Sequence, residues 1–367
     1  MERAAIFESV PNFSEGRRHD VINMIASAAG PAFLLDVDGD ADHNRTVMSL
    51  AGGRGRIVQG LIGAIGSAVQ RIDLREHRGV HPRVGAADVV PVIPLGTTTL
   101  DECREVAREI GARVWSELGV PVYFYGHGEP RTLADIRAGR AAPDLGGPDP
   151  HPTAGAVCVG ARRMLVAFNV MLYDIDLVGA RALARSIRES SAGLRGVQAL
   201  AFELPGHRVQ LSMNLFRLDE SGPADVIAEL ARRGVAMGAE QVVGLCPAIA
   251  ATPAADGRLL EGRLGSAAAD AGAESCEARG GDEHAALASR LRREAAELAR
   301  LAADQDAILG AAERAAALLH VLDAAQVLDA ELAALLTAAA RGLRAAVSPA
   351  TSGVYGARVD ALDARLA

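Results

Sequence analysis

The sequence predicts an α+β fold with two α/β units followed by an all-helical segment. Three observations carry this prediction. Strand and helix patterns alternate over residues 1–162, the order β-α-β-β-α-β follows over 163–250, and the pattern is helical over 282–367. The order of the second unit is that of a ferredoxin-like fold, and the first unit follows a related, longer order.

Short apolar runs bounded by glycine, proline or polar residues indicate the strands of the first unit. Thr98 or Thr99 is placed to cap the helix that begins at Leu100. Pro91 and Pro94 predict that their strand is an edge strand or an irregular one. The strands are expected at Ala5–Val10, Ala32–Val37, Thr46–Ala51, Val89–Leu95 and Val120–Tyr125, and the helices at Arg17–Ala29, Arg56–Ile72 and Leu100–Leu118.

The second unit and the C-terminal segment show clearer helical patterns. Residues 251–281 are rich in alanine, glycine and acidic residues with little periodicity, which predicts a linker. After it, a roughly heptad leucine stripe predicts a hairpin or small bundle that either dimerises or packs onto the chain. The second unit is expected to have strands at Met164–Leu172, Val197–Leu204, Val209–Phe216 and Glu240–Cys246 and helices at Leu177–Ser190 and Pro223–Arg233, and the stripe consists of Leu291, Leu298, Leu301 and Ile308.

Composition excludes several classes of function. The 38 Lys and Arg residues are interleaved with 46 Asp and Glu, so no basic face for nucleic acid is expected. No uncharged apolar stretch is long enough to span a bilayer, and the N-terminus lacks the pattern of a secretory signal. The four cysteines form no CxxC pair, which disfavours a disulfide framework or zinc site and favours a cytoplasmic location.

The segment His77–Asp88, which reads HRGVHPRVGAAD, is the first place to look for chemistry. Gly79 and Pro82 interrupt any helix, and titratable groups on an irregular segment are typical of active sites. We expect His81 to be a general base, because a neutral imidazole accepts a proton near pH 7. A structural hydrogen-bonding role is the alternative for both histidines. Without a helix or a third ligand, no metal site is expected here.

Polar residues at two other places are candidates for the same site. Asp36 and Asp38 alternate at the end of a strand and would share one face. Arg45 is suited to bind a carboxylate bidentately or, equally, to pair with a nearby aspartate. Asn12 and Ser14 either cap the following helix or face a ligand.

Several motifs together resemble the formimidoyltransferase family, which includes the transferase portion of formimidoyltransferase-cyclodeaminase. The resemblance covers about residues 4–250 in the right order. VPNFSEG, NRTV and HPRxGAxDV are specific to it. The other matching stretches are LLDVDGDADHNRTV, GVPVYFYG, GARRMLVAFNVML, VQLSMNLF and VVGLCP.

The resemblance implies two subdomains with a folate tunnel between them and transfer of a formimidoyl group from N-formimidoyl-L-glutamate to N5 of tetrahydrofolate in histidine degradation. The family's catalytic histidine corresponds to His81. Asp38 would face the cationic formimidoyl group, and Arg83 would bind a carboxylate. The family's folate loop corresponds to Gly146–Gly155, with Ala154 where relatives can carry an aromatic residue. The implied substrate-binding and folate-binding residues are Asn12, Ser14, Asp36, Asn44, Arg45, Tyr125, Gly146, Gly147, Gly155, Asn169 and Asn214.

The expected ligands are small molecules, namely formimidoylglutamate and tetrahydrofolate as co-substrate, with no metal and a homodimer as the assembly. Transfer from formylglutamate or formimidoylglycine and a non-catalytic folate-binding role are the alternatives. The segment 282–367 is interpreted as a shortened or degenerate cyclodeaminase-like region or an unrelated oligomerisation hairpin, without cyclodeaminase activity.

Overall fold

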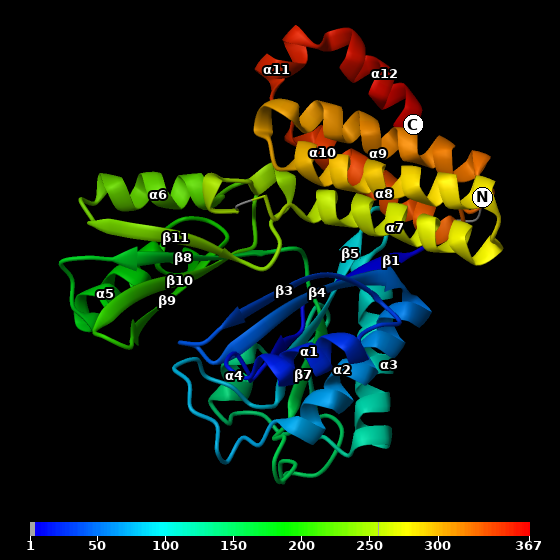
Figure 1. Cartoon of the computed structure of the whole chain (residues 1–367). Helices are drawn as coiled ribbons and strands as arrows, with labels where there is room; N and C mark the ends of the chain where they lie inside the picture. Colours follow the sequence, from blue (N-terminus) through cyan, green and yellow to red (C-terminus); the bar gives the residue numbers. More distant parts are fainter. Residues whose placement is uncertain (1–3, 256) are drawn as a thin grey trace. The chain divides into compact units, whose positions relative to one another are not determined.

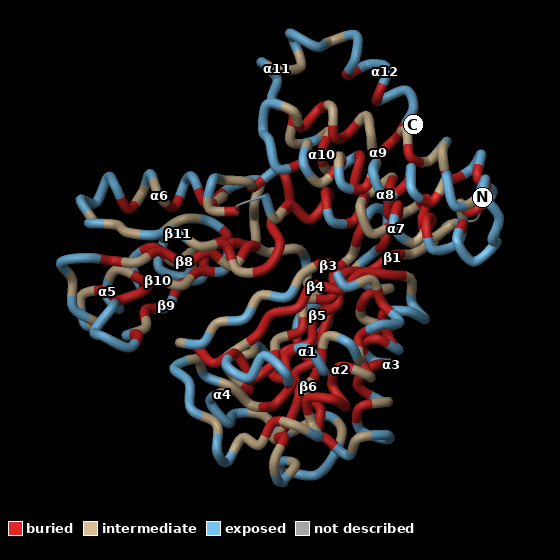
Figure 2. Tube along the Cα trace, viewed as in Figure 1, coloured by how far each residue is buried: buried red, intermediate tan, exposed pale blue. Residues whose placement is uncertain are grey.

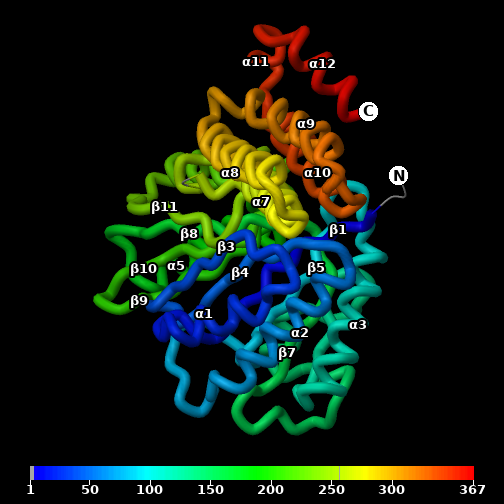
Figure 3. Tube along the Cα trace, turned by 45° about the vertical axis from the view of Figure 1, so that its right-hand side comes forward, coloured from blue at the N-terminus to red at the C-terminus, as the bar shows by residue number. Residues whose placement is uncertain are grey.

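The computed structural model describes residues 4–255 and 257–367. They form two compact units, one of Phe7–Gly244 and one of Leu245–Ala367 with the N-terminal residues up to Ile6. Figures 1 and 3 show their elements in two views, and each unit is described by itself. The predicted fold class is confirmed, because the chain has two separate sheets and a C-terminal run of helices.

The first sheet has seven strands in the order β1-β4-β2-β5-β7-β6, with β3 paired to β4. β3 and β4 form an antiparallel pair, whereas β5, β7 and β6 run parallel. The sequence patterns do not predict β7, nor β2, which is only two residues long. The strands are β1 Ile6–Ser9, β2 Asn12–Phe13, β3 Phe33–Asp40, β4 Arg45–Gly53, β5 Ala87–Leu95, β6 Val122–Gly126 and β7 Val157–Ala161.

The helices of this part bury apolar faces against the sheet and each other, as the red stretches in Figure 2 show. Thr99 caps α3, since its hydroxyl accepts from the backbone N–H of Glu102 and the Glu102 side chain accepts in return. Neither Asn12 nor Ser14 caps α1, whose N-cap residue is Arg18. The helices are α1 His19–Ala28, α2 Arg54–Arg71, α3 Leu100–Leu118 and the short α4 Leu133–Arg137.

The prediction that the proline-containing strand β5 lies at an edge is wrong. β5 is an internal strand between β2 and β7. Its irregularity is real, because the ladder between β5 and β2 shifts register between Asn12 and Phe13. On that side β5 pairs with the two-residue strand β2 and also with β1.

The second sheet is antiparallel, with the order β11-β8-β10-β9. Together with its two helices this is the predicted ferredoxin-like arrangement, which is confirmed. Residues at alternate positions share a face, so the registers bring Asn169, Ser212 and Gln241 together in one row across the sheet. The elements are β8 Val166–Leu172, α5 Leu177–Ile187, β9 Val197–Leu204, β10 Arg208–Leu215, α6 Pro223–Arg232 and β11 Met237–Val243.

The predicted linker over 251–281 is wrong for most of its length, because Leu260–Arg279 forms the helix α7. Small residues hide this helix from a periodicity search. An added Cβ at Gly265 would lie 2.3 Å from Leu298 Cδ2, and one at Gly272 would lie 2.3 Å from Leu322 Cδ2. A helix packed this closely on several sides shows no apolar stripe.

The rest of the C-terminal unit is helical, as predicted. Leu291, Leu298 and Ile308 are buried inside the bundle, so the leucine stripe packs onto the chain itself. No helix in the described ranges combines the length and the hydropathy that a membrane span needs. The helices after α7 are α8 Asp282–Ala302, α9 Ile308–Ala324, α10 Ala330–Ala346, α11 Pro349–Val354 and α12 Gly356–Leu366.

Gly85 is a position where the close approach of two chain segments requires glycine. A Cβ there would lie 1.7 Å from the backbone oxygen of Ala156. We predict that Gly85→Ala lowers the free energy of unfolding by at least about 2 kcal/mol, because backbone cannot move aside cheaply. Gly55→Ala is the control, since nothing lies within 4 Å of its added Cβ. Urea unfolding measures both, and equal midpoints would contradict the prediction.

Candidate active site

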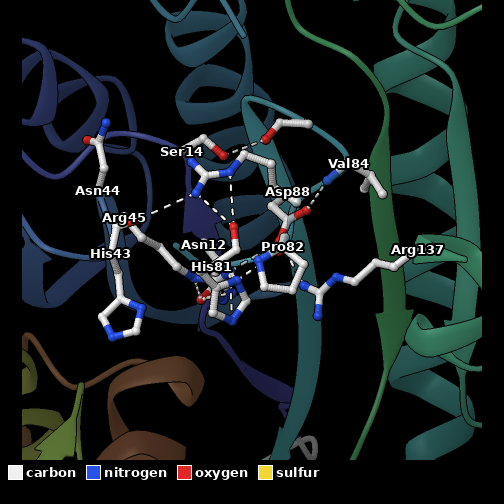
Figure 4. Close-up of polar contacts among 12 residues, drawn as sticks. Asn12, Ser14, His43, Asn44, Arg45, His81, Pro82, Val84, Asp88 and Arg137 are labelled. Carbon is white, nitrogen blue, oxygen red and sulfur yellow. Dashed lines mark hydrogen bonds and ion pairs between the residues drawn. The ribbon is translucent and has the colours of Figure 1, made fainter. Parts of the chain in front are cut away.

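His81 lies in the irregular segment between α2 and β5 and has two polar neighbours at one ring atom. Arg45 Nη1 lies 2.7 Å from His81 Nδ1, and the carbonyl oxygen of Pro82 lies 2.7 Å from the same atom. The ring also packs against the Phe202 ring, with 5.9 Å between centroids, and lies 6.2 Å from the His43 ring. Figure 4 shows His81 beside Arg45 and Pro82.

A buried carboxylate, Asp88, holds the charged groups next to His81. Asp88 is 1% exposed, and its Oδ2 accepts from Arg45 at 3.2 Å and from Arg137 at 2.9 Å. Its Oδ1 accepts from the backbone N–H of Val84 at 2.7 Å. Arg45 Nε also donates to Asn12 Oδ1 at 2.9 Å. Of the two roles that the sequence leaves open for Arg45, the structure therefore shows the ion pair (Figure 4).

The environment keeps His81 neutral and Arg45 charged at pH 7. Burial, and then the positive charges of Arg45 and Arg137, lower the pKa of His81 to about 2. Burial lowers the pKa of Arg45 to about 10, although Asp88 opposes this shift. One carboxylate faces two guanidinium groups in this cluster, so an excess of positive charge surrounds the neutral imidazole.

Three of the other predicted residues, together with His77, hold the loop of His81 in place. Asn44, at a φ of 48°, accepts from the backbone N–H of Gly16 and donates to the carbonyl of Arg78. Ser14 Oγ donates to the carbonyl of Gly85 at 2.7 Å. Arg83 donates to the carbonyl of His81 at 2.8 Å and contacts the ring of His77, whose Nε2 lies 3.1 Å from the carbonyl of Asn44.

The acidic pair at the end of β3 contacts β4 and the residue that follows β11. Asp38 Oδ2 accepts from the backbone N–H of Gly244 at 2.9 Å and so ties β3 to the end of β11. Asp36 lies opposite Ser49 on β4, next to a register shift in that ladder. The carboxylate that forms the ion pair with Arg45 is Asp88.

Tyr125 and the glycine loop have neighbours on other elements of the first sheet and its helices. Tyr125 is buried in an apolar cluster with Val89, Ile136 and Cys158. Gly146, at a φ of 93°, packs on Trp115 and Pro121, whereas an added Cβ at Gly147 would meet nothing within 4 Å.

Only the end of the glycine loop reaches the segment that carries His81. Gly155 forms a bridge with Gly85, and the carbonyl of Ala154 accepts from the N–H of Ala86 at 2.8 Å. The backbone of the loop thus supports the chain immediately after His81.

Asn169 and Asn214 lie on the polar face of the second sheet. Asn169 Nδ2 donates to Gln241 Oε1 at 3.1 Å, and Asn214 is exposed two positions along β10 from Ser212, which is the register partner of Asn169. Gln210, two positions from Ser212 in the other direction, accepts from His43 at 2.8 Å. The polar face therefore meets the loop between β3 and β4.

Sequence reasoning missed Asp88, Arg137, His43 and Gln210. Asp88 and His43 were visible as polar residues inside the motifs HPRVGAAD and DADHNRTV. Arg137 and Gln210 lie on α4 and β10 and join the cluster only through the fold. No local pattern marks them.

A cavity of about 440 Å³ opens beside the His81 segment. Val80, Pro82, Leu200 and Phe202 give it an apolar wall, and α5 contributes arginines. Among the residues that the structure describes, Arg181 and Arg185 have no hydrogen-bond or ion-pair partner. Its volume is in the range of cavities that bind small molecules.

The fold and the site suit one class of protein, an enzyme that moves protons on an anionic small molecule. A neutral imidazole suits proton transfer, and arginines beside an apolar wall suit a ligand with a ring and carboxylates. Within residues 4–255 and 257–367, no group of three His, Cys, Asp or Glu side chains is placed to hold a metal ion.

Comparison with known proteins identifies the family. The formiminotransferase domain, N-terminal subdomain, matches residues 6–162. Glutamate formimidoyltransferase from Streptococcus pyogenes serotype M1 is 36% identical over 269 residues, which cover 67% of this chain and 90% of the relative. The enzyme of the same name from Thermoplasma acidophilum is 37% identical, with 66% and 88% covered. Formimidoyltransferase-cyclodeaminase from Sus scrofa is 36% identical over 272 residues, with 66% of this chain and 50% of the relative covered. The chain belongs to the formimidoyltransferase family of enzymes.

The depressed pKa of His81 has a consequence for stability. The unfolded chain takes up a proton at His81 below about pH 6.5 while the folded chain does not, so acid favours unfolding. We predict that His81 removes up to about 1.4 kcal/mol of unfolding free energy per pH unit below 6.5. His81→Gln cannot titrate, so its stability should fall less between pH 7.5 and 5.5 in urea unfolding. Parallel curves would show that the folded protein binds the proton as well.

Proposed function

We propose that the protein transfers the formimidoyl group of N-formimidoyl-L-glutamate to N5 of tetrahydrofolate, with His81 as general base and then general acid. The observation that carries the proposal is a neutral His81 inside a cluster of arginines. The two glutamate formimidoyltransferases compared above support the choice of donor, since the chain covers 90% and 88% of their lengths.

The reaction needs one group that accepts a proton from the attacking nitrogen and then gives a proton to the leaving nitrogen. N5 of tetrahydrofolate attacks the amidine carbon and forms a new C–N bond, and its proton passes to Nε2 of His81. The imidazolium then protonates the glutamate nitrogen as its C–N bond breaks, which releases L-glutamate and 5-formimidoyltetrahydrofolate. An imidazole positioned for both transfers contributes about 10²–10⁴-fold to such a rate.

Arg45 controls which ring nitrogen of His81 is basic. Nδ1 can accept from Arg45 or donate to the carbonyl of Pro82, but not both. When Nδ1 donates to Pro82, the lone pair is on Nε2 and the ring can act as a base. Burial and the charges of Arg45 and Arg137 make His81 a weak base in the free protein. A substrate carboxylate that offsets these charges and draws the Arg45 guanidinium away from Nδ1 would favour that tautomer and raise the pKa of His81 toward the range that a general base needs.

The charges around the site fit two reactants that both carry carboxylates. Arg181 and Arg185 line the cavity beside Pro82 and are suited to bind a glutamate moiety. Asp38 at the end of β3 is proposed to face the cationic formimidoyl group, and Arg83 to keep the His81 loop in shape. The folate is proposed to lie in a tunnel between the two subdomains, of which this cavity is one part.

We place the reaction in the cytoplasmic degradation of histidine, in a homodimer. Four buried, free cysteines suit a reducing compartment. The C-terminal helices are proposed to have no cyclodeaminase activity.

Turnover tests the proposal directly. The purified full chain is given tetrahydrofolate with formimidoylglutamate, formylglutamate or formimidoylglycine, and the folate product is followed by absorbance. We expect turnover with formimidoylglutamate and a loss of about 10²–10⁴-fold in kcat for His81→Gln. Folate binding without turnover of any donor would overturn the enzyme assignment. Full activity of His81→Gln would overturn the role of His81.

The two free arginines of the cavity give a second prediction. Arg185→Gln should raise the KM of one reactant about tenfold with little change in kcat, because it removes binding that is the same in ground and transition states. Comparing KM for the donor and for tetrahydrofolate shows which glutamate moiety binds there. Arg263→Gln, outside the Phe7–Gly244 unit, is the matched control. An unchanged KM for both reactants would remove the cavity from the site.

A further inference from the structure

His43 is a second buried imidazole beside His81, and the proposed reaction does not yet use it. It is 7% exposed and ends the turn between β3 and β4, where its backbone N–H donates to Asp40 Oδ1 at 2.8 Å. Its Nε2 lies 2.8 Å from Gln210 Oε1 on β10. Its ring is therefore fixed from two different subdomains.

The contact with Gln210 determines which nitrogen of His43 carries the proton. An amide oxygen only accepts hydrogen bonds, so Nε2 of His43 must donate. In the neutral ring Nδ1 then has a lone pair. This atom is buried and has no hydrogen-bond partner within the described part of the chain. Buried acceptors without partners are uncommon in folded proteins, and each one asks for an explanation.

The unpartnered acceptor lies next to the proposed base. The rings of His43, His81 and Phe202 form a triangle with centroid distances of 6.2, 5.6 and 5.9 Å. Phe202 stands perpendicular to His43 and belongs to the edge strand β9. Phe202 is only partly buried and borders both the cavity and the His43 ring. A ligand in the cavity that displaces its side chain would reach this ring.

We propose that Nδ1 of His43 accepts a hydrogen bond from the N–H of the donor's formimidoyl group and thereby selects formimidoyl over formyl donors. The proposal rests on the proposed function. The terminal nitrogen of a formimidoyl group carries a hydrogen in its neutral and cationic forms and remains a donor after attack by N5. A formyl group has only an oxygen there, which would set two lone pairs against each other.

A hydrogen bond of this kind discriminates strongly between a formimidoyl and a formyl donor. A site built to pair with a substrate N–H loses that pairing when the analogue lacks the hydrogen. We expect kcat/KM for formimidoylglutamate to exceed that for formylglutamate by about 100-fold in the wild-type protein.

Two substitutions at position 43 separate the acceptor from the contact with Gln210. His43→Asn places an amide oxygen close to the position of Nδ1, whereas His43→Gln extends its amide to the position of Nε2. Both are measured on the full chain at saturating tetrahydrofolate. We expect His43→Gln to lower the ratio of the two kcat/KM values to near one and His43→Asn to keep it within about tenfold of wild type.

A third variant tests the tautomer without touching His43. Gln210→Glu puts a carboxylate beside Nε2–H, which stabilises the doubly protonated ring and turns Nδ1 into a donor. The ratio should fall here also, with formylglutamate gaining relative to formimidoylglutamate. If His43→Gln does not fold, Gln210→Glu tests whether Nδ1 of His43 acts as the acceptor, and an unchanged ratio would overturn that role.

Different results would refute the proposed function and the proposed role of His43. No turnover of any donor by the wild type would refute the proposed function. Turnover of both donors with equal kcat/KM would leave that function standing and overturn the role of His43. A His43→Gln variant that loses activity equally with both donors would show that His43 is only structural.

Discussion

The site depends on one buried carboxylate. Asp88 is almost fully excluded from solvent and accepts from two guanidinium groups and one backbone N–H. A lone buried charge of either sign would be costly, and breaking such a pair by removing one partner costs about 3–5 kcal/mol. Asp88 therefore lets two arginines remain charged beside His81, and burial together with their charge keeps that imidazole neutral.

The same constraint explains why the backbone around His81 is so closely fitted. The segment leaves α2 with glycine and proline in place of a regular element. Ser14, just after β2, and Asn44, in the β3–β4 turn, donate to its carbonyls, and Arg83 of the segment donates to the carbonyl of His43. Such fixing reduces the entropy that would otherwise be lost on aligning two reactants. An irregular segment can be an accurate catalytic support when its neighbours are strands.

The second subdomain contributes the polar face of its sheet to the candidate site. Its helices cover one face of the four-stranded sheet, and the other face presents amides from β8, β10 and β11. Gln210 from that face fixes the ring of His43, and Phe202 at its edge covers both histidines. A polar sheet face beside an arginine-rich loop suits a ligand with a heterocycle at one end and carboxylates at the other.

The sequence by itself determined the fold class, the ferredoxin-like order of the second unit and the importance of the segment around His81. These follow from local patterns, namely period-two and helical spacing and the chain breaks at Gly79 and Pro82. Only the tertiary structure decided that Asp88 pairs with Arg45 and that Gln210 contacts the ring of His43. The partners in these contacts are separated by 43 and 167 positions in the chain. Electrostatic and hydrogen-bond energies depend on distance in space, and local spacing does not specify that distance.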